Sequence, residues 1–90
     1  MVSRKELVEA DIDDMTDLEK EILKYMHSIP KPKHENILEN FRNKIDWEDL
    51  SDVLRGWNDD GILYKNYGHY CFTEYGEELV SKLKQPIKKV

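Results

Sequence analysis

The sequence has little cysteine and no long apolar run, and each shortage excludes a class of protein. A single cysteine, Cys71, cannot form an internal disulfide, so we expect a protein of a reducing, cytoplasmic compartment. No apolar run approaches the roughly 18–20 residues that a membrane-spanning helix needs. The first residues also contain no apolar core of the kind that a secretion signal requires. We therefore predict that the protein has no membrane partner.

Sequence motifs for catalysis are also lacking. The chain contains no glycine-rich phosphate loop, no nucleophile elbow and no paired-histidine motif of a metalloprotease. Carboxylates are plentiful, but they fall on predicted helix surfaces, without an apolar pocket that would shift their pKa values. These absences predict that the chain is not an enzyme and uses no cofactor.

Two groups of residues have side chains of the kind that bind metal ions. The acidic run from Asp11 to Asp17 lacks the glycine and the terminal glutamate of a calcium loop. His69 and Cys71 occupy alternate positions of one predicted strand and therefore point the same way, but no second cysteine lies near a histidine. We predict no metal site, and we expect Cys71 to be a small buried apolar residue.

What the chain does contain is enough aromatic and aliphatic residues for one modest core. Its 90 residues fit a single domain, and charged residues make up 37% of them. Two tryptophans, five tyrosines and two phenylalanines are available to anchor a core, so the charge does not imply disorder.

Local signals divide the chain into three parts. These are an N-terminal helical and acidic segment (residues 1–14), a central domain (15–84) and a basic tail (85–90). Thr16 and Glu19 have the spacing of a capping box, in which each side chain bonds the backbone N–H of the other residue at a helix start. Ser3 and Glu6 show the same spacing, before an acidic run that weakens the helix.

Further capping residues mark the later helices. Asp46 and Thr73 are suited to cap helices, and Gly61 is suited to end one. Apolar residues recur at helical spacing between these positions. The predicted helices are Ser3–Ala10, Asp17–His27, Glu35–Asn43, Trp47–Asp60 and Glu74–Lys84. In the fourth helix, Trp47 and Trp57 share the apolar face and are expected to be core anchors.

A β-hairpin is predicted over Ile62–Phe72. Its two arms are rich in residues that favour strands, and Gly68 between them can take the positive φ of a tight turn. We expect Tyr64 and Tyr70 to pack against each other across the strands, and Tyr67 to be exposed at the turn.

Two stretches of the sequence resemble a known family. They are Leu54, Trp57 and Gly61-Ile62-Leu63, followed by Tyr70-Cys71-Phe72-Thr73-Glu74-Tyr75-Gly76-Glu77-Glu78-Leu79. This run resembles the winged helix-turn-helix of MarR-like and related small bacterial, archaeal and viral regulators, over about Asp17–Leu83. The resemblance implies an α+β fold with a three-helix core, a two-stranded wing and flanking N- and C-terminal helices. It also implies a homodimeric transcription regulator that binds double-stranded DNA.

The charge of the predicted recognition helix opposes that function. Between Trp47 and Asp60 there are five carboxylates and one guanidinium, a local net charge of −4, and the whole chain carries −5. DNA affinity depends on neutralising phosphates, so a surface of this sign repels DNA. Scattered cations can nevertheless form a local positive patch, because net charge does not fix the local field.

The candidate nucleic-acid-binding residues come from three places. In the fourth helix, Ser51 and Arg55 are expected to face the major groove, and Asn58 is a third outward-facing donor. The remaining candidates lie beside the helix and on the wing, where they are expected to contact the phosphates and sugars of the DNA backbone. The full candidate set is Lys31, Lys33, Ser51, Arg55, Lys65, Tyr67 and His69.

A second interpretation uses the acidic helix itself. In it, the winged helix is a protein-interaction module whose fourth helix docks a basic protein partner or mimics nucleic acid. For the homodimer, the expected contact residues are apolar positions of the first and last helices. These are Leu7, Val8, Ile12, Leu79, Val80 and Leu83.

Overall fold

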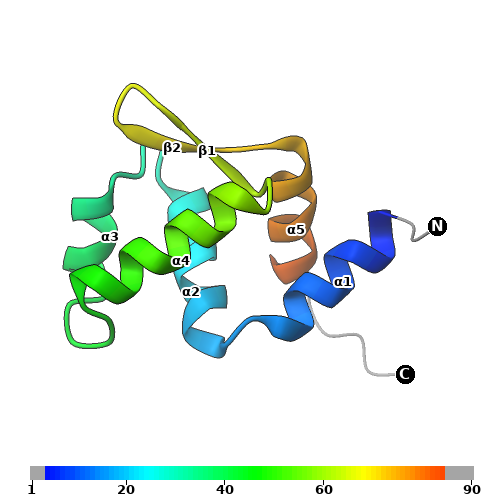
Figure 1. The fold of residues 1–90 in the computed structure, drawn as a ribbon, viewed down its shortest axis with the longest axis horizontal. Coiled ribbons are helices and arrows are strands. Elements are labelled where there is room, and N and C mark those ends of the chain that lie inside the picture. Colours follow the sequence, from blue (N-terminus) through cyan, green and yellow to red (C-terminus); the bar gives the residue numbers. More distant parts are fainter. Residues whose placement is uncertain (1–3, 85–90) are drawn as a thin grey trace.

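The computed structural model describes residues 4–84, which form five helices and one two-stranded antiparallel hairpin (Figure 1). The elements are α1 (Arg4–Asp14), α2 (Asp17–Ser28), α3 (His34–Asn40), α4 (Trp47–Asp59), β1 (Leu63–Asn66), β2 (His69–Phe72) and α5 (Glu74–Lys84). The predicted α+β class is confirmed, and the order of elements is compatible with a winged helix. The predicted tail, residues 85–90, lies outside the described residues.

Side-chain caps start the helices where the sequence predicted them. The N–H of Glu19 donates to the Thr16 hydroxyl at 3.1 Å, and the N–H of Thr16 donates to the Glu19 carboxylate at 2.8 Å. Asp46 accepts from the N–H of Asp49 at 2.8 Å at the start of α4. Each cap satisfies N–H groups that have no partner inside the helix, and so it fixes the first turn.

Two helix ends differ from the predictions by more than one residue. Helix α1 continues to Asp14, four residues beyond its predicted end, because it packs along α5: Val8 is buried, and the Tyr75 hydroxyl donates to Asp11. These contacts outweigh the repulsion within the acidic run. Its predicted capping residue Ser3 lies outside the described residues. Helix α3 ends at Asn40 instead of Asn43, since the chain turns there and the N–H of Lys44 bonds to the carbonyl of Phe41 at 2.8 Å.

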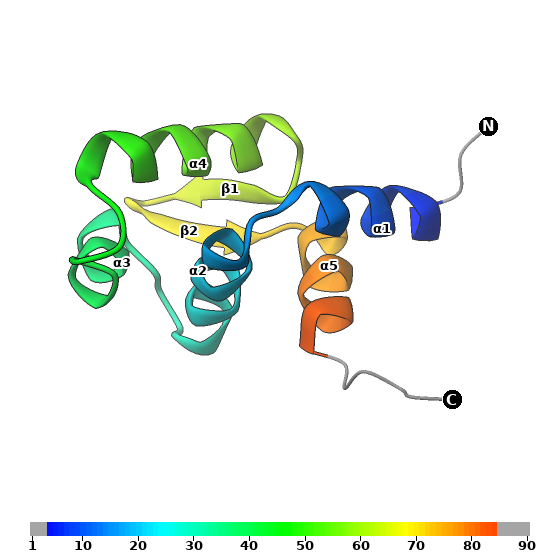
Figure 2. The same ribbon diagram turned by 90° about the horizontal axis from the view of Figure 1, so that it is seen from below.

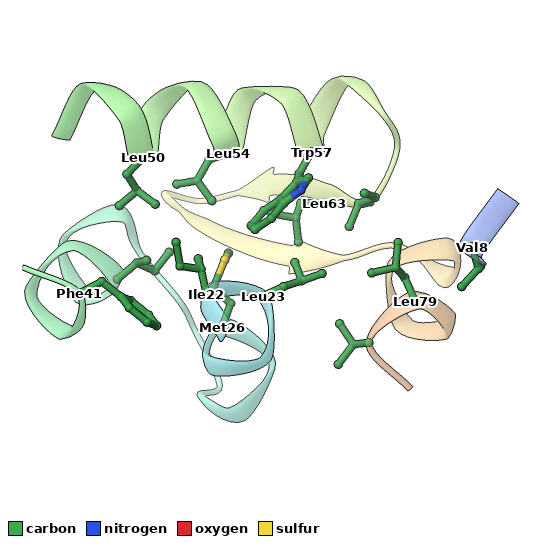
Figure 3. Close-up of a cluster of buried hydrophobic side chains, with 13 residues drawn as sticks. Val8, Ile22, Leu23, Met26, Phe41, Leu50, Leu54, Trp57, Leu63 and Leu79 are labelled. Atoms are coloured by element: carbon green, nitrogen blue, oxygen red, sulfur yellow. The ribbon is translucent and has the colours of Figure 1, made fainter. Parts of the chain in front are cut away.

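The core lies between α2, α4 and the hairpin, and it continues to α5 (Figure 3). Helix α4 buries one face, which carries Leu50, Leu54 and Trp57 at spacings of four and three residues. They meet Ile22 and Met26 of α2, which are fully buried. Buried apolar surface contributes about 25 cal/mol per Å², so this interface stabilises the packing of α4 on α2.

A backbone bond ties the segment between α2 and α3 to the hairpin. The N–H of Tyr70 in β2 donates to the carbonyl of Pro32 at 2.8 Å. Pro32 is buried and needs no ladder partner for its own nitrogen, because proline has no N–H. Pro32 thereby pairs with the outer edge of β2 at this one residue, as a neighbouring strand would do along its whole length.

The prediction for Trp47 is wrong, whereas that for Trp57 is confirmed. Trp57 is 5% exposed and belongs to the core, but Trp47 is 53% exposed. Both lie on the same side of α4 by periodicity, yet Trp47 is the first residue of the helix. The core ends one turn later, at Leu50, so the indole of Trp47 projects past it.

The register of the hairpin also corrects a prediction. Tyr64 is opposite Cys71, and Lys65 is opposite Tyr70, so Tyr64 and Tyr70 are not a cross-strand pair. Successive strand residues point to opposite faces, and the two tyrosines therefore lie on different faces of the hairpin. Cys71 is half-buried beside the exposed Tyr64, instead of fully buried as predicted.

Three of the six apolar residues expected at a dimer interface lie inside the chain. Val8, Leu79 and Val80 are buried where α1 packs on α5. They are not available to a second copy of the chain while both helices stay in place. Leu7 is 48% exposed, so the contact surface is corrected in part and the homodimer itself stays a prediction.

The contact at Gly76 gives the first testable prediction. A Cβ at this position would lie 2.1 Å from the carbonyl oxygen of Ile62, an atom held by bonds from Thr73. We expect Gly76→Ala to lower the free energy of unfolding by about 1–3 kcal/mol, the usual cost of overpacking, measured by urea denaturation.

Gly56 is the matched control, because it is also helical and nothing lies within 4 Å of a Cβ built there. Gly56→Ala should raise the free energy of unfolding by roughly 0.5–1 kcal/mol through helix propensity alone. Equal effects of the two substitutions would show that the close approach of α5 to Ile62 is not a real constraint.

Candidate functional site: the groove between α4 and the hairpin

A groove of about 490 Å³ lies between α3, α4 and the hairpin. Figure 2 shows why it forms: β1 and β2 run back alongside α4, so that their turn lies toward α3 and the first residues of α4. We call it the α4–hairpin groove. Its lining residues are His34, Glu35, Trp47, Ser51, Leu54, Arg55, Asn58, Lys65, Gly68 and Tyr70.

The polar residues of α4 fall into two stripes. Ser51, Arg55 and Asn58 follow one another at four and three residues, so they share a helix face, and all three line the groove. The second stripe is exposed and does not line the groove. It consists of Glu48, Asp49, Asp52 and Asp59. None of these four carboxylates of α4 lines the groove.

The charge of the groove is opposite in sign to that of the acidic stripe. Arg55 and Lys65 bring two positive charges and Glu35 one negative charge, which gives +1 with His34 neutral. The acidic stripe carries −4 from its four carboxylates. An anion approaching α4 is thus attracted on the hairpin side and repelled on the outer side.

Arg55 is the more adaptable of the two cations. Its side chain is 72% exposed, and its contact with Asp52 is long, 4.0 Å between Nη1 and Oδ1. Exposed pairs of this kind contribute little, so the guanidinium is able to turn toward a ligand. Its planar donor fork suits phosphate or the edge of a guanine.

Lys65 reaches the groove because of the hairpin register. Its partner on β2 is Tyr70, and its Nζ lies 5.7 Å from the centroid of the Tyr70 ring. This distance is within the range of a cation–π contact, which steadies the ammonium on the groove wall.

His34 and Trp47 form the wall at the start of α3 and α4. Their ring centroids are 3.8 Å apart, with the planes inclined by 60°. The Nε2 atom of His34 lies 3.1 Å from the Ser51 hydroxyl, whereas its Nδ1 atom is buried without a partner among the described residues. A protonated histidine needs a hydrogen-bond partner for each of its two ring nitrogens. Because one nitrogen of His34 is buried without a partner, the neutral form is favoured.

The surroundings of His34 act on its pKa in the same direction. Burial lowers the pKa of His34 from its ordinary value of 6.5, and the positive charge of Lys65 lowers it further. At neutral pH, the imidazole is therefore uncharged and presents an apolar ring to Trp47.

The structure gathers some of the predicted site residues but not all of them. Ser51, Arg55 and Lys65 meet in the groove. Lys31 and Lys33 are exposed on either side of Pro32 and do not line it.

Two more predicted residues belong to the hairpin but lie outside the groove. Tyr67 is at the turn with φ +49° and is 97% exposed. His69 is opposite Asn66, which places it on the hairpin face away from Lys65. Sequence reasoning did not include His34, Trp47 and Tyr70 in the site. The aromatic character of Trp47 and Tyr70 is visible in the sequence, but it equally fits packing inside the fold.

No protein-family model, curated protein or solved structure matches this chain. Within residues 4–84, no helix is long and apolar enough to cross a membrane. No three metal-ligating side chains of this part of the chain gather at one point.

The environment of His34 gives the second prediction. We expect an NMR titration to place the pKa of His34 below 6.5, and Lys65→Met to raise it because one repulsive charge is removed. The unfolded chain then binds more protons than the native chain just below pH 6.5. The contribution of His34 to stability is thus complete above that pH and is lost as pH falls toward the native pKa.

Lys82→Met is the control for this titration, since Lys82 lies on α5 and pairs with Glu9. It should leave the pKa of His34 unchanged. A His34 pKa at or above 6.5 in the native protein would contradict the description of this wall of the groove.

Proposed function

We propose that this chain is a small winged-helix protein that binds DNA through the α4–hairpin groove and acts as a transcription regulator. The order of helices and hairpin supports the winged helix, and the bond from Tyr70 to Pro32 ties the hairpin to the segment between α2 and α3. The observation that carries the proposal is the stripe of donors on α4, with Lys65 facing it from the hairpin.

Each lining residue has a distinct role in this proposal. Arg55 and Lys65 contact phosphates, or Arg55 reads the edge of a guanine. Ser51 and Asn58 donate hydrogen bonds from neighbouring turns of the same face of α4. Tyr67, exposed at the turn, and the lysines beside Pro32 extend the contact beyond the groove.

The acidic stripe fixes the direction of approach. A helix that entered a major groove with its outermost face would place Asp52 and Asp59 next to phosphates, which costs Coulomb energy at every contact. Contact from the hairpin side avoids this cost, because the residues facing the ligand are then Ser51, Arg55 and Asn58.

A second candidate function follows from the same separation of charge. The stripe of Glu48, Asp49, Asp52 and Asp59 is exposed, and it would suit a basic protein partner. Under this alternative, the chain would not be retained on immobilised DNA at low salt. It would instead bind a basic partner with an affinity that falls when Asp52 and Asp59 are replaced by asparagine.

DNA binding gives the third prediction. In a fluorescence-anisotropy titration, we expect binding that weakens with salt, with a slope of about 0.7–0.9 in log K per log salt for each phosphate contact. Arg55→Ala should reduce that slope by one contact, or cost about 1–3 kcal/mol at one base if Arg55 reads a guanine.

Arg42→Ala is the matched control, because Arg42 is exposed in the turn after α3 and does not line the groove. It should bind DNA as the parent does. If Arg55→Ala and Lys65→Ala both bind like the parent while DNA binding persists, the groove is not the contact surface.

A further inference from the structure

We propose that the DNA held in the α4–hairpin groove is single-stranded, with one base stacked on Trp47 and the adjoining backbone on Arg55 and Lys65. This inference rests on the DNA-binding function proposed above and narrows it to one form of DNA. The observation that supports the inference is that one groove brings together the exposed Trp47 and the two cations Arg55 and Lys65.

Trp47 has the properties of a stacking platform. Its side chain is 53% exposed although it belongs to a groove wall, and the His34 ring packs against it. His34 is itself held by the Ser51 hydroxyl at 3.1 Å. An aromatic already fixed by its neighbours loses little conformational freedom when a base stacks on it, which favours binding.

The base stacked on Trp47 must be unpaired. The flat face of a base is available to a side chain only where the base has left the stack of its own duplex. A continuous duplex offers base edges in its grooves and no faces. An indole exposed at the start of α4 can contact a regular duplex only at base edges, such as a thymine methyl group, whereas it can stack on the whole face of an unpaired base.

The number and position of the cations fit one strand. Arg55 and Lys65 face the groove from opposite walls, α4 and β1, and Glu35 leaves the groove with a net charge of +1. This charge can neutralise about one phosphate, which is the charge of one nucleotide. The neutral state of His34 keeps the stacking region apolar.

The acidic stripe of α4 disfavours the second strand. A duplex seated on Arg55 would place its other backbone toward the outer face of α4, where Glu48, Asp52 and Asp59 are exposed. A single strand can follow the groove and stay on the hairpin side. The same four carboxylates that oppose duplex binding thus select for single-stranded DNA.

The experiment compares a labelled single strand of about 12 nucleotides with the duplex of the same sequence, a length close to the site sizes of known single-strand binders. Affinities are measured by anisotropy at equal salt, together with the tryptophan fluorescence of the protein. We expect the single strand to bind about tenfold more tightly. We also expect it to quench Trp47, which is exposed, and not Trp57, which is buried.

Variants of Trp47 provide the decisive comparison. Trp47→Ala should weaken single-strand binding by about 5- to 150-fold, the range for loss of one stacked base, and Trp47→Phe should restore much of it. Trp47→Phe should also abolish the fluorescence quenching. Tyr64→Ala is the matched control, since Tyr64 is 47% exposed on the other face of the hairpin, and it should bind normally. Circular dichroism of each variant confirms that it is folded.

The possible failures are distinguishable. Duplex binding that is equal to or tighter than single-strand binding, and that depends on Arg55, overturns this inference but leaves the proposed function in place. Single-strand binding that Trp47→Ala does not weaken overturns the assignment of the base to Trp47. No binding of either form at low salt overturns the inference and the proposed function together.

Discussion

The position of the groove depends on one hydrogen-bonded junction, where the chain leaving α4 meets the start of α5. The N–H of Thr73 donates to the carbonyl of Ile62 at 3.1 Å, and the Thr73 hydroxyl lies against the carbonyls of Gly61 and Ile62. That hydroxyl also accepts from the N–H of Gly76 at 3.0 Å, which begins α5. One side chain thereby closes the hairpin and caps the next helix.

The bonds at Thr73 restrict the position of the hairpin relative to α4. Its strands have four residues each, and the turn between them must reverse the chain in two residues with positive φ, which Tyr67 and Gly68 provide at +49° and +86°. Because Leu63 is buried in the core beside Trp57, the hairpin cannot swing away from α4. The groove is thus a consequence of packing and closure at the base of the hairpin.

The parts of the fold that depend on local chemistry were predictable from the sequence. Thr16, Asp46 and Thr73 each act on an N–H group three residues away, so their patterns mark helix starts without knowledge of the rest of the chain. The positive φ at Gly61 and Gly68 is local in the same sense. The length of α1 was not predictable, since it is set by contacts with α5, more than sixty residues away in the sequence.

The site was only partly predictable, and the reason lies in register and in helix ends. Ser51 and Arg55 follow from the helical period, which shows that they lie off the apolar stripe. The exposure of Trp47 does not follow, because periodicity places a residue on a side of a helix but does not say where the core stops along its axis. The contact of Lys65 with Tyr70 does not follow from the sequence either. A shift of one residue in strand pairing would have put Lys65 on the other face of the hairpin.

The total charge of α4 gave a misleading picture of what the helix can bind, since charge acts through its position on a surface. Four carboxylates and one guanidinium repel DNA when they are averaged over the helix. Placed on two stripes, they attract an anion from one side and reject it from the other. In the proposed function, the outer stripe adds selectivity, because it penalises ligands broad enough to reach around the helix and spares those that fit between α4 and the hairpin. An acidic helix is therefore compatible with DNA binding when its donors face a groove and its carboxylates do not.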